Sequence, residues 1–203
     1  MLTAFKGIIN PDVVLNIATG DKELTLKEEG TDSTIRKLHI QDVPENAFAF
    51  TLDYQPGKRK NRWFKQLSCY VDVDNKEGVN KGCDLVLLFP KPGENRWIVL
   101  IFDLKSKKPV IKKTEKQLLN SELYVRYLMT MAEHHYGVDA NSVEYKRAIV
   151  TTKAKLSKNP TYPKDKKTSE SSDQRNPVSE SFHIKAVRVR RKEAHVHLGA
   201  LLK

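Results

Sequence analysis

The chain has 203 residues, of which 39% are hydrophobic and 30% are charged, and it carries a formal net charge of +11. This length fits a single domain over 1–203, and the two cysteines exclude the disulfide framework of a small secreted protein. The apolar runs are too short for a bilayer span or a secretory signal, so we expect a cytoplasmic protein with no membrane partner.

The N-terminal part of the chain is rich in alternating apolar and polar residues, a pattern typical of half-buried strands. Strands of this kind are predicted at 23–27, 35–40, 47–54 and 67–74. We therefore expect residues 1–64 to form a β-rich extension that recognises substrate or a partner. A cluster at 58–64 combines Arg59 and Arg62 with aromatic residues, which either stack on nucleobases or anchor an exposed loop.

Two strongly apolar strands, 84–89 and 97–105, are separated by a short turn and are predicted to pair as a hairpin. The period of two along the second strand places Asp103 and Lys105 on one face. Asp84 opens the first strand, so pairing of the hairpin brings it near both of them.

Charged groups inside apolar strands cost free energy unless a metal ion or a counter-charge compensates them. Two carboxylates can hold one Mg²⁺, which keeps several waters, and one of these can act as a nucleophile. Lys105 beside the ion can orient or deprotonate that water and stabilise charge on a phosphate. This pattern favours phosphodiester hydrolysis. The alternative is a structural ion pair between Asp103 and Lys105, with Asp84 capping a turn.

Asp84, followed after eighteen residues by Asp103-Leu104-Lys105, resembles the signature of the PD-(D/E)xK nuclease superfamily. The resemblance implies an α/β, restriction-endonuclease-like core, with a mixed β-sheet flanked by helices. It further implies Mg²⁺, for which Mn²⁺ can substitute, bound by Asp84, Asp103 and the main-chain carbonyl of Leu104, with Lys105 assisting the water. The implied activity is that of a metal-dependent endonuclease, with DNA favoured over RNA.

The sequence departs from the family pattern in two places. Cys83 stands where a proline often precedes the first acid. The acid that many members supply from an upstream helix is not identified, although several glutamates are formally available: Glu23, Glu28, Glu29, Glu45 and Glu77. Loss of that acid would favour an alternative function, a catalytically inactive nucleic-acid-binding or scaffolding subunit of a larger complex.

A helix is predicted behind the second strand, with Thr114 as its N-cap and Gly137 at its end. Its apolar stripe is assigned to residues that recur every four positions, Leu119, Leu123, Tyr127 and Met131, and these are flanked by Leu118, Val125, Leu128 and Ala132. Gln117 fits the third position of a capping box and also matches a glutamine that faces the site in relatives, so both roles stay open. With a strand at 145–152, the catalytic core is expected over 65–152.

The C-terminal part contains two further features. Residues 153–177 are rich in Lys, Ser, Thr and Pro and are predicted to form a mobile basic loop. Residues 178–203 are expected to contribute a basic strand at a sheet edge. His195 and His197 share one strand face, but no acid or cysteine accompanies them at metal-ligand spacing, which favours a solvated face.

The excess of positive charge lies entirely in the second half of the chain. Residues 1–100 contain 14 Lys and Arg against 14 Asp and Glu, whereas residues 101–203 contain 22 against 11. Basic clusters suit a polyanion such as nucleic acid, and a solubilising surface is the alternative. The predicted contacts are Arg59, Arg62, Lys107, Lys108, Lys112, Lys113, Arg188, Arg190 and Arg191. A homodimer or a partner subunit is compatible with this prediction.

Overall fold

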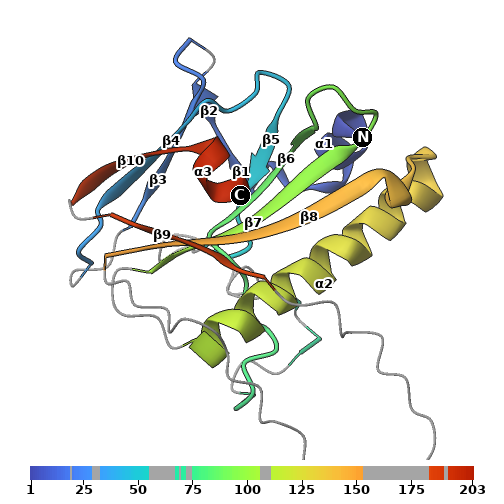
Figure 1. The fold of residues 1–203 in the computed structure, drawn as a ribbon. Helices are drawn as coiled ribbons and strands as arrows, with labels where there is room; N and C mark the ends of the chain where they lie inside the picture. The colour runs from blue at the N-terminus through green and yellow to red at the C-terminus, as the bar shows by residue number, and fades with distance from the viewer. Residues whose placement is uncertain are drawn as a thin grey trace, which may run out of the picture.

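The structure, a computed structural model, is an α/β fold of two mixed β-sheets flanked by a few helices (Figure 1). It describes residues 1–18, 20–28, 33–54, 67–68, 70–71, 75–105, 111–152, 183–189 and 192–203. The elements in chain order are α1 (Leu2–Ile8), η1 (Pro11–Val13), β1 (Val14–Leu15), β2 (Ile17–Ala18), β3 (Glu23–Lys27), β4 (Lys37–Gln41), β5 (Phe48–Phe50), β6 (Leu85–Pro90), β7 (Trp97–Lys105), α2 (Ile111–Tyr136), η3 (Ala140–Ser142), β8 (Val143–Thr151), β9 (Lys185–Arg188), β10 (Glu193–His197) and α3 (Leu198–Leu202).

The larger sheet has six strands in the order β1-β5-β6-β7-β8-β9. Its first four strands are antiparallel neighbours, whereas β8 runs parallel to β7 and β9 runs parallel to β8. A parallel pair needs a crossover connection, and α2 provides it between β7 and β8. The predicted hairpin of β6 and β7 is confirmed, as is the position of β9 at a sheet edge.

The smaller sheet has four strands in the order β10-β4-β3-β2. Strand β10, close to the end of the chain, runs parallel to β4, so segments about 150 residues apart in sequence lie side by side. Strands at 23–27 and near 35–40 were expected from the alternating pattern, and both are present. The fold therefore joins the N-terminal hairpin to the C-terminal strand in one sheet.

The protein is built in three layers (Figure 1). On one face of the six-stranded sheet, Val86 and Leu88 pack in a core with residues of α1 and α2. On the other face, Leu85 and Leu87 pack in a second core with the four-stranded sheet and α3. Because β6 and β7 are covered on both faces, their sequences are almost continuously apolar.

Two features in the first part of the chain differ from the sequence prediction. Helix α1 lies in the region expected to be β-rich. Residues 67–68 and 70–71 are not in a strand; instead Asn80 accepts a hydrogen bond from Ser68 N and donates to the carbonyls of Ser68 and Val71. These side-chain bonds satisfy backbone groups that a strand would pair with another strand.

The limits and the buried face of α2 also differ. The helix begins at Ile111, so the prediction of Thr114 as N-cap is wrong, while its end before Gly137, at φ +64°, is confirmed. Leu123 and Tyr127 are 56% and 57% exposed. A stripe repeating every four residues turns by about 40° per step around a helix of 3.6 residues per turn, so it leaves the core. The buried face follows alternating steps of three and four, with Leu118, Val125, Leu128 and Ala132.

The mobile loop expected at 153–177 lies outside the described residues. Within the described part of the chain, no helix combines the length and the apolar character needed to cross a membrane.

A buried ion pair connects α2 to β8. The Glu122 side chain is only 4% exposed and pairs with Arg147, whereas Arg126, at 2.8 Å from the same carboxylate, is 52% exposed. We expect Arg147→Met to lower the free energy of unfolding by about 3–5 kcal/mol, because it leaves the Glu122 charge buried without its main partner. Urea denaturation measures this change.

The matched control is Arg126→Met, which removes a solvent-exposed partner and is expected to cost much less. Equal losses in the two variants would contradict the assignment of Arg147 as the principal partner of Glu122.

Candidate active site

The site forms where β7 extends beyond the end of β6. The last pair of the β6 and β7 ladder is Leu85 with Phe102, and Asp84 precedes it directly. Leu104 N has no strand partner on that side and donates to Asp84 Oδ2 over 2.5 Å. Since the N–H and C=O of one strand residue point to the same neighbour, the Leu104 carbonyl is also directed to the Asp84 side.

Asp103 and Lys105 share one face of β7, as the period of two predicted. The Asp103 side chain is completely buried, and its Oδ2 forms an ion pair with Lys105 Nζ. The Lys105 ammonium group is thus the close partner of this buried oxygen. The buried negative charge of Asp103 is therefore offset by one close positive charge, that of Lys105.

The carboxyl groups of Asp84 and Asp103 lie in contact. Burial raises the pKa of Asp84 well above its ordinary value, and the negative charge of Asp103 and a hydrogen bond between the two groups raise it further. The bond from Leu104 N and the charge of Lys105 act in the opposite direction. Two acids in this arrangement resist double ionisation until a further positive charge is added.

Gln117 connects the helix to these groups. Its Oε1 accepts a hydrogen bond from Lys105 Nζ at 2.9 Å, and its Nε2 donates to Gly82 O at 2.6 Å. A longer contact of 3.4 Å joins Nε2 to Asp103 Oδ1. Because α2 starts at Ile111, Gln117 does not have the capping-box role that the sequence left open. Its side chain instead holds Lys105 and Asp103 in place.

A third acid, Asp53, approaches the site from the segment after β5. Reduced solvation raises the pKa of Asp53, and so does the nearby charge of Asp103, while Lys105 lowers it. Three of the glutamates proposed from the sequence pair elsewhere: Glu23, Glu45 and Glu77 pair with His39, Lys22 and Lys116. Glu29 lies outside the described residues. Asp53 follows an apolar strand closely and Asp84 directly precedes one, and this placement of acids beside apolar runs was the available sequence signal.

Close packing of the Leu52 segment against Gly82 and Cys83 positions Asp53. Leu52 N donates to Cys83 O at 3.1 Å, which continues the pairing of β5 and β6 towards the site. A Cβ on Gly82 would lie 2.3 Å from the Leu52 carbonyl oxygen, so only glycine fits there. Burial raises the pKa of the adjacent Cys83 thiol to about 12, which makes it a neutral packing group at physiological pH and not a nucleophile.

We expect Gly82→Ala to destabilise the protein by about 1–3 kcal/mol, because the added methyl group must displace backbone at Leu52. Thermal unfolding measures the loss. Gly199→Ala is the control, since nothing lies within 4 Å of a Cβ at that helical position. Equal stability of the Gly82→Ala protein and the wild type would refute this packing argument.

The structure places some of the predicted basic contacts near the site. Lys112 and Lys113 are exposed on the first turn of α2, five residues or fewer before Gln117. Arg188 pairs in register with Thr151, which pairs with Lys105, so the Cα atoms of Arg188 and Lys105 are about 10 Å apart across three strands. The remaining predicted contacts lie outside the described residues: Arg59, Arg62, Lys107, Lys108, Arg190 and Arg191.

Comparison of the chain with protein-family models, curated proteins and solved structures finds no match. What the site can do is therefore inferred from the groups that it brings together. These are the buried Asp103 in contact with the partly buried Asp84, a third acid nearby, one lysine and one glutamine that fixes the lysine.

Proposed function

We propose that this protein is a metal-dependent nuclease of the PD-(D/E)xK superfamily that hydrolyses phosphodiester bonds of nucleic acid. The observation that carries the proposal is the meeting of Asp84, Asp103 and Lys105 at one end of the six-stranded sheet. The order β6, β7, α2, β8 also supports it, because the resemblance implies strand, strand, helix, strand.

The residues of the site fit Mg²⁺, with Mn²⁺ as a substitute. Asp84, Asp103 and the Leu104 carbonyl would hold the ion, and they form an all-oxygen donor set of the kind that Mg²⁺ prefers. The complete burial of Asp103 and the raised pKa of Asp84 are what two carboxylates that share a cation should show. When bound, such an ion activates water and offsets negative charge on a phosphate.

Lys105 orients the attacking water and stabilises the charge that develops on the phosphate oxygens. Its ammonium group is held between Asp103 and Gln117, so it reaches the phosphate without losing further side-chain freedom. Gln117 is a positioning residue, because it acts through Lys105 and through the Gly82 carbonyl.

DNA is the proposed substrate, and this preference follows from the family resemblance. The exposed Lys112, Lys113 and Arg188 surround the lysine end of β7 and supply positive charge for a phosphate backbone. Each residue that neutralises a phosphate releases a counterion, so binding should weaken steeply with salt.

A second candidate function is binding of nucleic acid, or scaffolding of a larger complex, without cleavage. One observation favours it: Lys105 already forms an ion pair with Asp103 and so provides a counter-charge within the protein. In that case the acids and the lysine are a structural ion-pair network, and the basic surface alone carries the function.

Incubation of the purified protein with duplex DNA, single-stranded DNA and RNA, in Mg²⁺ or Mn²⁺ against EDTA, tests the proposal. Cleavage that requires the metal ion supports the nuclease. Salt-sensitive binding without cleavage of any substrate would favour the second function. An affinity that does not change with ionic strength would contradict both.

A further inference from the structure

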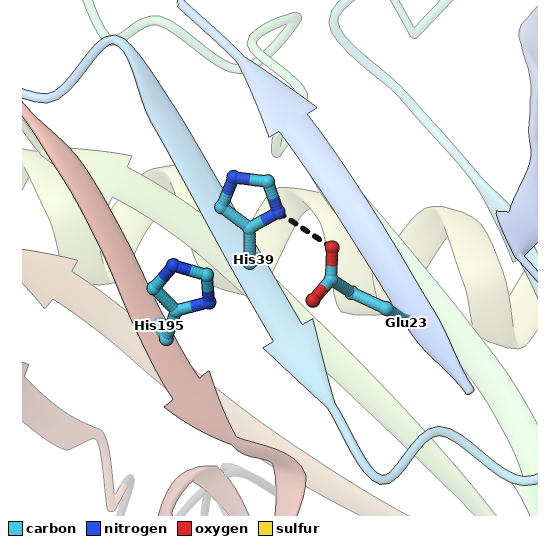
Figure 2. A group of neighbouring side chains, drawn as sticks. All are labelled: Glu23, His39 and His195. Atoms are coloured by element: carbon cyan, nitrogen blue, oxygen red, sulfur yellow. Dashed lines mark hydrogen bonds and ion pairs between the residues drawn. The ribbon is translucent and has the colours of Figure 1, made fainter. Parts of the chain in front are cut away.

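The outer face of the four-stranded sheet carries a second cluster of ionisable groups, separate from the carboxylate site. Strands β3, β4 and β10 alternate so that apolar side chains such as Leu24, Leu38 and Ala194 point inward. Glu23, His39 and His195 stand on the opposite face, one from each of the three strands (Figure 2).

Strand pairing fixes the geometry of this cluster. His195 is the register partner of His39, and the two imidazole rings stack with centroids 4.6 Å apart and planes inclined by 13°. Glu23 Oε1 lies 2.6 Å from His39 Nδ1. One oxygen of Glu23 and one nitrogen of each histidine all lie within 4.8 Å of one another.

These distances are close to what a transition-metal site requires. Zinc bonds to imidazole nitrogen and carboxylate oxygen of about 2.0–2.2 Å place tetrahedral ligand atoms about 3.3 Å apart. Separations between 2.6 and 4.8 Å reach that value by small side-chain rotations, because the strands already hold the three residues together.

The hydrogen-bond partner on the other side of the His39 ring is also the kind expected for a metal-binding histidine. Its Nε2 lies 3.0 Å from Glu193 Oε1, on the side of the ring away from Glu23. A histidine that binds a metal through one nitrogen usually donates the other N–H to a carboxylate, which fixes the tautomer and the ring orientation. With Nδ1 directed to the ion, the Nε2–H group donates to Glu193.

We propose that Glu23, His39 and His195 form a binding site for a Zn²⁺-type transition-metal ion. Two imidazoles and one carboxylate suit Zn²⁺, Co²⁺ or Ni²⁺, whereas Mg²⁺ prefers the all-oxygen ligands of the other site. The ion joins the C-terminal strand β10 to the N-terminal strands β3 and β4 and stabilises this sheet. The exposed position of His195 leaves a further coordination position open to water.

Calorimetric titration of the full chain with Zn²⁺ tests the site, with excess Mg²⁺ present to compete for the carboxylates of the other site. One ion per chain is expected for the wild type, and Co²⁺ should give the visible absorption of a tetrahedral complex. His39→Ala and His195→Ala should lose both signals. Glu193→Gln should weaken binding by about 10- to 100-fold.

His197→Ala is the matched control, because His197 lies on the same face of β10 but pairs with Asp42 at 2.7 Å. It should bind Zn²⁺ as the wild type does. Circular dichroism verifies that each variant is folded. The proposal would be overturned by absence of binding to the wild type, or by folded His39→Ala and His195→Ala proteins that retain it. Neither result depends on whether the protein cuts nucleic acid.

Discussion

Replacement of Lys105 by alanine is expected to lower the rate of metal-dependent cleavage by about 10²- to 10⁴-fold and to leave binding of nucleic acid largely intact. In the proposed mechanism Asp103 and Gln117 would direct the lysine to the reacting phosphate, whereas affinity would come from exposed basic residues such as Lys112, Lys113 and Arg188. Single-turnover cleavage measures the first effect, and fluorescence anisotropy with a labelled duplex in EDTA measures the second.

Lys91→Ala provides the control for removal of a lysine. Lys91 lies at the opposite end of the hairpin, where it pairs with Glu94 and Glu144, each at 2.9 Å. Its loss should change neither cleavage nor binding. A Lys105→Ala protein that cleaves at the wild-type rate would show that the lysine has only a structural role.

Replacement of Asp84 by asparagine is expected to have opposite effects on activity and stability. Cleavage should fall by about 10²- to 10³-fold or more, because one of the two carboxylates proposed to hold the ion is lost. The metal-free protein should become more stable, since asparagine relieves the contact of two buried acids and still accepts the bond from Leu104 N. Cleavage assays measure the first effect, and thermal unfolding with and without Mg²⁺ measures the change in stability.

The pH dependence follows from the raised pKa of Asp84. In the folded, metal-free protein this carboxyl holds a proton at pH values where the unfolded chain, with a pKa of about 3.8, has released it. Stability should therefore fall as the pH rises from about 3.8 through the folded-state pKa. Asp84→Asn should reduce this fall, and Mg²⁺ should stabilise the wild type but not the variant. A variant that is less stable than the wild type in EDTA at neutral pH would contradict this account of the two acids.

The centre of the site was predictable because it is local in sequence. Asp84, Asp103 and Lys105 lie on two strands joined by a short turn, and the period of two alone brings them to one end of the hairpin. The helix behind them was also predictable, although its first residue and its buried face were not. A long amphipathic helix with apolar residues on several faces leaves the choice of the buried face to tertiary packing.

Contacts between distant segments were not predictable. Asp53 lies near Asp103, 50 positions later in the chain, because β5 pairs with β6, and the strand patterns alone do not specify that pairing. The same holds for His195, which meets His39 only because β10 runs parallel to β4. A search for metal ligands at short spacing therefore finds His195 and His197. In the fold these two have different partners: His197 contacts Asp42, whereas His195 stacks on His39 of the neighbouring strand.

The measurement that tests the central claim most directly is cleavage of an end-labelled DNA duplex by the wild type and by Asp103→Asn, purified in parallel, in Mg²⁺ and in EDTA. Parallel purification controls for a contaminating nuclease. The site predicts fragments only for the wild type with Mg²⁺. Equal cleavage by both proteins, or cleavage by the wild type in EDTA, would show that Asp103 and its neighbours do not form a metal-dependent nuclease centre.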